Sequence, residues 1–295
     1  MPKLPVIGLS CGDPKGIGPE IVAKAIHDKQ LSKLATFKIF GRSELGPSQL
    51  TDLEAAQIAL ATLREATDAG LNHQIDALVT APVNKARLRL ADPHFTGHTE
   101  FFAQICGAKP VMAFVSAQPL LRVALVTRHL PLGAVAERLN AIEILHTIRT
   151  FHLGLQQLGL PQPKIAVAGL NPHAGEGGML GDEEKKFISP AIAQAHKEGI
   201  LVSGPFPGDT IFWRALQGEF DGVVAMYHDQ GLAAVKTVAF QTAVQWSLGL
   251  PFIRVSVDHG TAEEISGKNC ADITNLRHAI ELAITLTHQK LLRHF

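Results

Sequence analysis

Short apolar runs alternate with longer amphipathic stretches along most of this chain. The apolar runs cover residues 5–10, 75–80, 121–127, 164–170, 221–227 and 252–257, and stretches with a helical period follow at 20–29, 132–158 and 183–198. Apolar runs of about five to seven residues without polar alternation are typical of strands buried on both faces, as in a parallel sheet. Strands that alternate with helices predict an α/β fold, and residues 272–292 predict a long closing helix.

Polar residues follow directly after five of these apolar runs. They are Asn84 with Lys85, Arg128 with His129, Asn171 with His173, His228 with Asp229, and Asp258 with His259. In an open parallel α/β sheet, ligands bind outside the carboxyl ends of the strands. We therefore expect these loops to form one polar site, although Asn-Pro and Asp-His-Gly sequences also make ordinary turns and caps.

Two glycine-containing motifs follow the first apolar run. Gly8-Leu-Ser10-Cys-Gly12 matches a hydrolase nucleophile elbow, but seven residues, 13–19, separate it from the expected helix, so we interpret it as a chance match. Gly16-Ile-Gly18 lacks the third glycine of the dinucleotide fingerprint, because Ile21 occupies that position. A glycine turn that opens a helix can still receive an anion on its N–H groups, and a simple tight turn before Pro19 is the alternative.

Composition narrows the class of protein. The chain has 295 residues, enough for two domains or one large one, with 27 basic and 27 acidic residues. This charge balance argues against nucleic acid or an anionic membrane surface as the main partner, and no apolar run is long enough to span a bilayer. Cys11, Cys106 and Cys270 are far apart and odd in number, and the N-terminus lacks a signal-peptide pattern. We expect a soluble cytoplasmic protein.

Three histidines carry the strongest chemical signal. His129, His173 and His228 each follow a different apolar run. Imidazole binds zinc, cobalt, nickel or iron, and three such ligands with open positions describe a catalytic metal site. Ordinary surface or core histidines are the alternative, and the absence of an HExxH motif gives metalloprotease chemistry no support.

Further polar residues stand near the same loops. His98-Thr99-Glu100 opens a helical stretch and predicts either a ligand contact or a simple cap. Lys85, Lys236 and Arg254 are cations suited to an anionic substrate.

Taken together and in order, these motifs resemble the 4-hydroxythreonine-4-phosphate dehydrogenase family, which serves pyridoxal phosphate biosynthesis. The resemblance covers nearly the whole chain. It rests on seven motifs, namely Gly12-Asp-Pro-Lys-Gly-Ile-Gly-Pro-Glu20, Thr80-Ala-Pro-Val-Asn-Lys85, Gly97-His-Thr-Glu100, Asn171-Pro-His-Ala-Gly-Glu176, Gly208-Asp-Thr210, Tyr227-His-Asp-Gln-Gly231 and Asp258-His-Gly-Thr-Ala262.

The resemblance implies a two-domain α/β fold like that of isocitrate and isopropylmalate dehydrogenases. We expect a first domain of residues 1–98 plus 275–295 and a second of 99–274. It also implies a homodimer whose active site lies in the cleft between domains and is shared between subunits. One divalent metal per site (zinc, magnesium or cobalt) would be bound by His129, His173 and His228.

The same resemblance assigns the remaining site residues. The substrate, a small phosphorylated hydroxy acid, would be contacted by His98, Thr99, Lys236, Gln245 and Arg254. The segment 258–268 is similar to the nicotinamide-cofactor loop of isopropylmalate dehydrogenases, which places NAD or NADP on Asp258, Gly260, Thr261 and Ala262. The implied reaction is oxidation of 4-phosphohydroxy-L-threonine at its C3 hydroxyl, followed by decarboxylation to 3-amino-2-oxopropyl phosphate. Lys236 and Asp229 are the candidates for proton transfer.

Three departures from the family pattern leave alternatives open. Gln245 stands where the family usually has Asn, Lys15 stands where Ala is common, and the chain is shorter than family members between Gly41 and Ile75. Relatives with this pattern also oxidise 4-phospho-D-threonate or 4-phospho-D-erythronate. A metal-dependent hydrolase and a non-catalytic metabolite-binding protein are the competing classes of function.

Overall fold

The computed structural model describes residues 4–41 and 46–292, and each apolar run of the sequence forms a strand in it. These six strands are β1 (Val6–Ser10), β3 (Ala77–Thr80), β5 (Leu120–Leu125), β6 (Ile165–Ala168), β8 (Gly222–Ala225) and β10 (Ile253–Ser256). Four more strands were not predicted: β2 (Thr36–Phe40), β4 (Val111–Ala117), β7 (Val202–Phe206) and β9 (Val244–Leu248).

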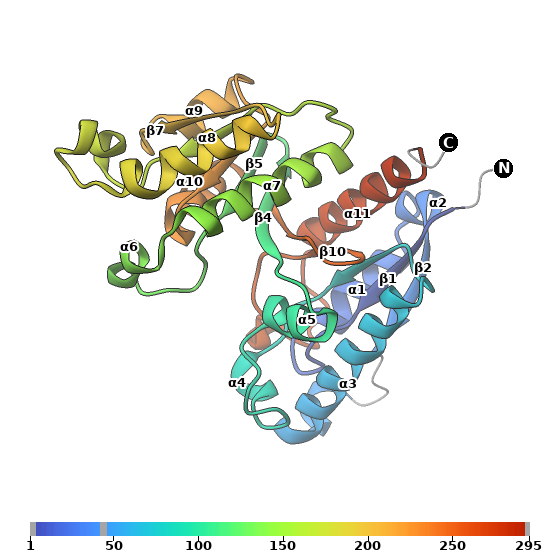
Figure 1. Cartoon of the computed structure of the whole chain (residues 1–295). Coiled ribbons are helices and arrows are strands. Elements are labelled where there is room, and N and C mark those ends of the chain that lie inside the picture. The colour runs from blue at the N-terminus through green and yellow to red at the C-terminus, as the bar shows by residue number, and fades with distance from the viewer. Residues whose placement is uncertain (1–3, 42–45, 293–295) are drawn as a thin grey trace. The chain divides into compact units, whose positions relative to one another are not determined.

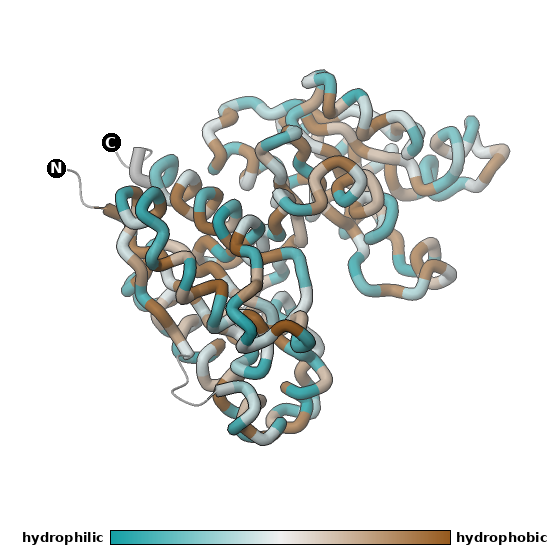
Figure 2. Tube along the Cα trace, turned by 180° about the vertical axis from the view of Figure 1, so that it is seen from behind, coloured by the Kyte–Doolittle hydropathy of each residue, from teal (hydrophilic) through white to brown (hydrophobic). Residues whose placement is uncertain are grey.

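Eleven α-helices connect the strands within the described residues. They are α1 (Gly18–Ile26), α2 (Leu31–Leu34), α3 (Asp52–Leu71), α4 (Lys85–Leu88), α5 (His98–Cys106), α6 (Val135–Arg138), α7 (Ala141–Gln157), α8 (Ser189–Lys197), α9 (Ile211–Leu216), α10 (His228–Ala239) and α11 (Thr274–Leu292). The α/β fold expected from the pattern is therefore confirmed. Figure 2 shows the alternating polar and apolar segments along the helices that produced the helical signal.

The chain divides into two compact units, and unit 1 combines its two ends, residues up to Pro110 and from Val244 onward. Within unit 1 the strand order is β2-β1-β3-β10-β9. β1, β2, β3 and β10 are parallel neighbours, whereas β9 pairs antiparallel with β10. In Figure 1 the blue N-terminal elements and the red α11 lie together for this reason.

The helices of unit 1 pack closely on its strands. α11 lies against β10 and β3, and α3 lies against β1 and β2. A Cβ atom at Gly70 of α3 would come within 2.9 Å of the Phe252 ring, so this close approach of helix to strand requires glycine. Phe101 and Phe102 of α5 pack into the same core as Phe252.

Unit 2 comprises residues Val111–Ala243, with the strand order β4-β5-β8-β6-β7. β5, β8, β6 and β7 are parallel, and β4 pairs antiparallel with β5. α10 lies on one face, where a Cβ at Gly231 would come 2.8 Å from Leu125. α7 lies on the other face, where a Cβ at Gly222 would come 2.5 Å from Phe151.

The sheets differ from a purely parallel arrangement, because β4/β5 and β9/β10 are antiparallel pairs. The expected boundaries, 1–98 plus 275–295 and 99–274, also differ from those of the compact units. Residues 99–110 join unit 1 because α5 buries its phenylalanines there, and 244–274 join it because β10 hydrogen-bonds to β3. The shortened region between Gly41 and Ile75 contains α3; residues 42–45 lie outside the described residues.

Candidate active site

The loops that follow β1, β3 and β10 meet at one edge of the sheet of unit 1, because these three parallel strands are neighbours. Gly12 has a φ of +68°, and a Cβ there would lie 2.3 Å from the Pro82 carbonyl oxygen. A Cβ at Gly18 would lie 2.0 Å from the Cys11 carbonyl oxygen. The glycines of the first loop therefore serve close backbone packing, and Pro19 stands in the first turn of α1 as expected.

The structure also clarifies the apparent nucleophile elbow. Ser10 is fully buried, and its Oγ accepts a hydrogen bond from the Gly12 amide at 3.3 Å. α1 begins only at Gly18. Ser10 is thus a buried residue at the end of a strand, as the chance-match interpretation requires.

The predicted cofactor segment, 258–268, folds onto this glycine turn. The Ile17 amide donates to the Thr261 carbonyl at 2.9 Å, and the Ser266 hydroxyl donates to the Gly16 carbonyl at 2.8 Å. A Cβ at Gly16 would come 2.9 Å from Thr261, which explains the glycine there. Two motifs at opposite ends of the sequence are thereby built into one surface.

Individual residues of this segment have distinct environments. The Asp258 amide donates to the side-chain oxygen of Asn275, on α11, at 2.8 Å. Gly260 has open space where a Cβ would be, and Ala262 adopts a left-handed φ of +43°. A non-glycine residue held in this region stores backbone strain, a feature that clusters at ligand-binding loops.

A network of charges connects the segment to a buried ion pair between Arg87 and Asp13, and nothing in the local sequence pattern predicted it. Arg87 donates to Asp13 at 2.5 Å, to Glu263 at 2.6 Å and to Asp52 at 3.1 Å. Burial opposes the charge of Arg87, but hydrogen bonds to Glu263 and Asp13 raise its pKa above the ordinary value. The hydrogen bond from Arg87 holds the pKa of Glu263 below its usual range.

Arg254 of β10 is a buried cation, with an exposed fraction of only 1%. Its Nη1 donates to Gln245 Oε1 and to Ser247 Oγ, and its Nη2 donates to Thr80 Oγ1 at 2.6 Å. The guanidinium lies over the Phe102 ring at 5.3 Å. No described carboxylate forms an ion pair with it, and burial lowers its pKa to about 9 although Glu100 opposes this. An anion bound next to a buried cation that has no ion pair would stabilise its charge.

His98 lies beside this guanidinium, at the first position of α5. Its ring stacks on Phe102 with centroids 6.2 Å apart, and its Nε2 is buried without a hydrogen-bond partner. Burial, and then the charges of Arg254 and Lys85, hold the pKa of His98 well below its usual range. His98 is therefore neutral near neutral pH, and its unsatisfied ring nitrogen is available to a ligand.

Two further predicted substrate residues lie in unit 1. Thr99 is buried in the first turn of α5, with 4% exposure. Gln245 is 5% exposed; its Oε1 accepts from Arg254 and Ser256, and its Nε2 donates to Ser247 at 3.1 Å. Because both ends of the amide are used internally, Gln245 supports Arg254, and a direct contact with substrate stays a prediction.

The predicted metal ligands lie in unit 2, past the carboxyl ends of the parallel strands β5, β8 and β6. The rings of His129 and His228 have centroids 5.5 Å apart. His228 Nδ1 lies 2.7 Å from an Asp229 carboxylate oxygen, which leaves Nε2 as the ring nitrogen that is open to a ligand. His173 is 66% exposed, and its Nδ1 lies 3.6 Å from Glu176.

Among the described residues, no group of three or more His, Cys, Asp or Glu side chains lies close enough to hold a metal ion. The structure thus brings His129 and His228 together and does not bring His173 to them. Two imidazoles, one of them hydrogen-bonded to a carboxylate, are donors of the type that a divalent transition metal takes, but a catalytic site of this kind needs a third protein ligand.

The loop that carries His173 has unusual backbone geometry. Residues 173–177 all have positive φ, forming a left-handed turn. Glu184, which sequence reasoning missed, is 4% exposed and anchors the start of the loop by accepting from the Leu170 and Asn171 amides at 2.8 Å. A Cβ at Gly175 would come 2.6 Å from the Glu184 carboxylate. Gly175, the glycine of the Asn171–Glu176 motif, therefore serves this turn.

Lys236 lies on α10 eight residues after His228, about 12 Å along a helix. Its Nζ lies over the Phe240 ring at 5.0 Å. Its partner candidate for proton transfer, Asp229, is 89% exposed and bonded to His228.

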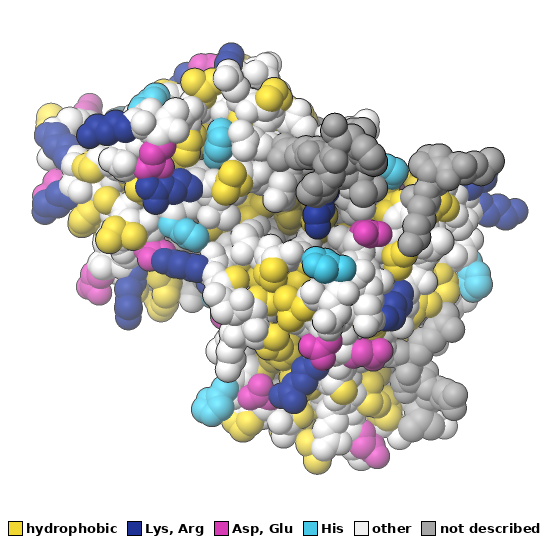
Figure 3. All heavy atoms as spheres, turned by 45° about the vertical axis from the view of Figure 1, so that its right-hand side comes forward, with side chains coloured by type: hydrophobic (Ala, Val, Ile, Leu, Met, Phe, Trp, Pro, Cys, Tyr) yellow, Lys and Arg dark blue, Asp and Glu magenta, His cyan; other side chains and the backbone are white. Residues whose placement is uncertain are grey.

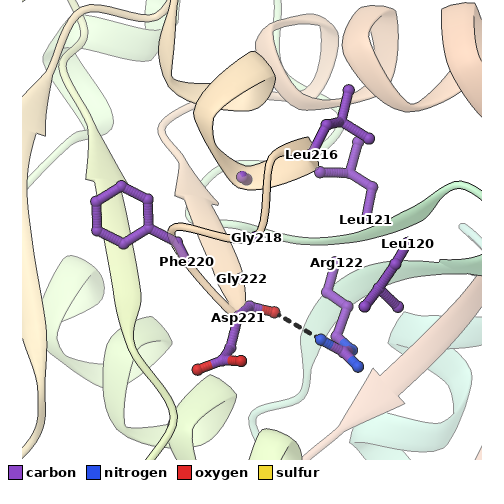
Figure 4. A pocket seen from close by; sticks show the side chains of 9 residues that line it. Leu120, Leu121, Arg122, Leu216, Gly218, Phe220, Asp221 and Gly222 are labelled. Carbon is purple, nitrogen blue, oxygen red and sulfur yellow. Dashed lines mark hydrogen bonds between the residues drawn. The ribbon is translucent and has the colours of Figure 1, made fainter.

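A small cavity of about 90 Å³ in unit 2 lies away from these histidines (Figure 4). Leu120, Arg122 and Gly222 line it, at the amino-terminal ends of β5 and β8. His129 and His228 follow the opposite ends of the same parallel strands. The cavity is thus separate from the predicted site.

The five polar loops of the sequence therefore form two sets, one at the edge of each unit's sheet. On the face seen in Figure 3, acidic and basic side chains are intermixed, in line with the zero net charge. No helix in the described part of the chain is long and apolar enough to cross a bilayer.

Comparison with known proteins places these features in a family. The model of the family described as "Pyridoxal phosphate biosynthetic protein PdxA" matches residues 19–283. A 4-hydroxythreonine-4-phosphate dehydrogenase of Desulforapulum autotrophicum is 40% identical, over 95% of this chain and 94% of that protein. A protein of Symbiobacterium thermophilum with the provisional name D-threonate 4-phosphate dehydrogenase is 37% identical, over 96% of each.

Solved structures agree. A 4-hydroxythreonine-4-phosphate dehydrogenase of Klebsiella pneumoniae has a TM-score of 0.85 and 33% identity, covering 96% of this chain and 98% of that one. An isocitrate dehydrogenase of Methylococcus capsulatus, 15% identical with a TM-score of 0.52, covers 97% of this chain and 86% of that one and shows the shared fold alone. The predicted isocitrate-dehydrogenase-like fold is thus confirmed, and the chain belongs to the PdxA family of pyridoxal phosphate biosynthetic proteins.

Proposed function

We propose that this protein catalyses the metal-dependent, NAD(P)-linked oxidation of 4-phosphohydroxy-L-threonine at its C3 hydroxyl, with decarboxylation to 3-amino-2-oxopropyl phosphate. The observation that carries the proposal is Arg254, a fully buried guanidinium without a carboxylate partner, placed on the strand that leads directly into the segment 258–268. A buried cation on the strand that precedes the segment assigned to the nucleotide suits an anionic substrate that is oxidised by a dinucleotide.

Substrate binding relies on donors that the protein itself does not use. A guanidinium has five N–H donors. Arg254 donates three of them in hydrogen bonds to Gln245, Ser247 and Thr80, and its Nε–H has no partner. With the ring nitrogen of neutral His98 and the cation of Lys85, these free donors suit a carboxylate or phosphate oxygen. We assign His98, Thr99, Arg254 and Lys236 to the substrate, and Gln245 to the support of Arg254.

The dinucleotide is assigned to Asp258, Gly260, Thr261 and Ala262. The anchored backbone on either side of Gly260 and the open space at that glycine support a close approach by the cofactor. Either NAD or NADP fits this assignment. When bound, the nicotinamide ring would supply the acceptor for the hydride from C3 of the substrate, and the hydroxyl proton would pass to a residue of this chain.

A divalent metal, zinc, magnesium or cobalt, is assigned to His129, His173 and His228. When bound, it supplies Lewis-acid polarisation of the hydroxyl that is oxidised and of the product carbonyl during loss of CO₂. Asp229 fixes the ring orientation of His228 through its hydrogen bond to Nδ1. Proton transfer is assigned to Lys236 or Asp229, since both belong to the helix that begins at His228.

We further propose a cytoplasmic homodimer whose subunits share each active site, as the family resemblance implies. The substrate is a small molecule, and neither nucleic acid nor a membrane is a partner. The absence of a disulfide at Cys11, Cys106 and Cys270, all in the described part of the chain, supports a reducing compartment.

Oxidation of 4-phospho-D-threonate is the second candidate activity, favoured by the name of the relative from Symbiobacterium thermophilum. 4-Phospho-D-erythronate belongs to the same chemical class. All three substrates present a phosphate and a carboxylate, so the pocket around Arg254 suits each of them.

The test is an absorbance assay of cofactor reduction with each of the three substrates, NAD⁺ or NADP⁺, and added zinc, magnesium or cobalt. A parallel sample contains a chelator. Metal-dependent reduction with 4-phosphohydroxy-L-threonine supports the main proposal, and preferential reduction with 4-phospho-D-threonate supports the second. Silence with all three substrates and both cofactors contradicts the dehydrogenase assignment and leaves the hydrolase and the metabolite-binding protein to be tested.

A further inference from the structure

Arg87 is the centre of a charge cluster that links three distant parts of unit 1. We define the Arg87 cluster as Asp13, Lys15, Asp52, Arg87 and Glu263. Arg87 pairs with all three carboxylates, and Lys15 pairs with Asp52 at 2.8 Å. Asp13 is fully buried and the Arg87 side chain is 7% exposed, so the centre of the cluster is shielded from water.

Glu263 is the cluster's connection to the cofactor segment. It stands one residue after Ala262, in the segment 258–268. Its Oε2 accepts from Arg87 Nη2 at 2.6 Å, and its Oε1 accepts from Asn84 Nδ2 at 2.8 Å, from Arg87 Nη1 at 3.1 Å and from the Thr261 hydroxyl at 3.3 Å. All four hydrogen bonds are donated by side chains. Two of the donors, Asn84 and Arg87, lie in or just after the loop that follows β3.

We infer that Glu263 is a positioning residue, which through Arg87 and Asn84 holds the segment 258–268 in its dinucleotide-binding conformation before the cofactor arrives. This inference rests on the proposed assignment of that segment to NAD or NADP. Glu263 itself is not assigned a contact with the cofactor.

The physical reason lies in the backbone next to Glu263. Ala262 has a left-handed φ of +43°, a conformation that persists only where the surroundings enforce it. Gly260 adds a residue with little intrinsic conformational preference. Two charge-assisted bonds to a buried, fixed guanidinium supply the constraint immediately after the strained residue. Where a segment is already ordered, binding does not carry the ordering cost, and the apparent affinity rises accordingly.

Glu263→Gln is the informative variant, because it removes the charge and keeps the shape. Arg87 retains Asp13 and Asp52, so no buried cation is left without a partner. Arg87→Met, by contrast, would leave the buried Asp13 uncompensated and endanger folding. Glu65→Gln is the matched control, since the Glu65 side chain is exposed on α3 and forms no hydrogen bond or ion pair with any described residue.

The experiment measures NADH and NADPH binding to the full-length protein by fluorescence titration, together with amide hydrogen exchange of residues 258–268. For Glu263→Gln we expect the dissociation constant of the preferred dinucleotide to rise about tenfold, as for loss of one charged hydrogen bond. Exchange should accelerate in 258–268 in the cofactor-free protein, with kcat at saturating cofactor within about twofold of the unaltered protein. Glu65→Gln should change none of these.

Two outcomes contradict the inference. The first is unchanged affinity and exchange in Glu263→Gln. The second is a loss of thermal stability with unchanged affinity, which assigns the cluster a structural role alone. If the unaltered protein binds neither NADH nor NADPH, the proposed function fails; the exchange measurement then still decides whether Glu263 orders the segment.

Discussion

The polar sites of the two units are built in opposite ways. In unit 1, Arg254 and Arg87 are buried and held by hydrogen bonds to named partners in the same chain. In unit 2, His173 is 66% exposed and His228 is 36% exposed, and no described group of three donors converges. Folding alone therefore fixes the side chains of the proposed site in unit 1. The histidines of unit 2 still need a further component to bring them together, and we propose that this component is the divalent metal.

Charge explains the contrast. A buried guanidinium must be fixed by partners, because an unsatisfied charge in a core is strongly destabilising. Imidazoles near water carry no such penalty, so a folded protein tolerates them without fixed partners. We therefore expect substitution of the site histidines in unit 2 to affect activity alone, and substitution of the buried charges in unit 1 to affect stability as well.

The largest effect is expected for His173→Ala. Turnover should fall by at least about a thousandfold because one of the assigned metal ligands is lost. The thermal unfolding midpoint should not change, since the side chain is largely exposed. Full activity in this variant, measured by cofactor reduction, would show that His173 is not a metal ligand. A large loss of stability would contradict the expectation that the site residues of unit 2 affect activity alone.

Arg254→Met is expected to lower kcat/KM by about a hundredfold or more, because it removes a charged donor from a buried pocket. Gln245, Ser247 and Thr80 also lose their common partner, so some stability should be lost. Arg64→Met, at an exposed arginine of α3, is the control and should behave as the unaltered protein. Equal kcat/KM in both variants would show that the pocket does not bind substrate.

Asp13→Asn tests the buried charges of unit 1 by stability alone. We expect the free energy of unfolding in urea to fall by about 3 kcal/mol, the usual result of removing one partner of a buried ion pair. Asp182→Asn breaks the exposed pair of Asp182 with Lys186 in unit 2 and should leave stability unchanged. Similar losses in both variants would mean that burial does not distinguish the two units.

The smallest expected effect concerns pH. Because burial and neighbouring cations lower the pKa of His98 from 6.5, the unfolded chain binds a proton there while the native state does not. Well above pH 6.5 neither state binds this proton, so His98 contributes no pH dependence. As the pH falls below that value, the proton bound by the unfolded chain lowers the free energy of unfolding, by up to about 1.4 kcal/mol per pH unit. His98→Gln should therefore show a shallower loss of unfolding free energy between about pH 7 and pH 5.

The control for this titration is His94→Gln, at an exposed histidine of the same unit. It should keep the pH dependence of the unaltered protein. An identical slope in the His98 variant would mean that His98 titrates as freely in the native state as in the unfolded chain.

Sequence reasoning recovered six of the ten described strands; of the four that it missed, β4 is an apolar strand that the pattern should have revealed, and the other three were missed for identifiable reasons. β9 (Val244–Leu248) carries two polar residues, Gln245 and Ser247. Both are buried, and their side-chain oxygens accept hydrogen bonds from Arg254. β2 has a half-exposed Lys38, and β7 contains Gly204 and Pro205. In these strands the apolar signal is diluted by residues whose place is decided by partners on other strands.

The sequence by itself determined the alternation of strands and helices, the family, and the loops that carry chemistry, because these depend on local periodicity and on motifs of adjacent residues. Only the tertiary structure decided that Arg87 joins Asp13 to Glu263, that Gln245 supports Arg254, and that Glu184 anchors the loop of His173. Such pairs bring together residues up to 176 positions apart. Their energy comes from shared burial, which exists only once the chain has folded.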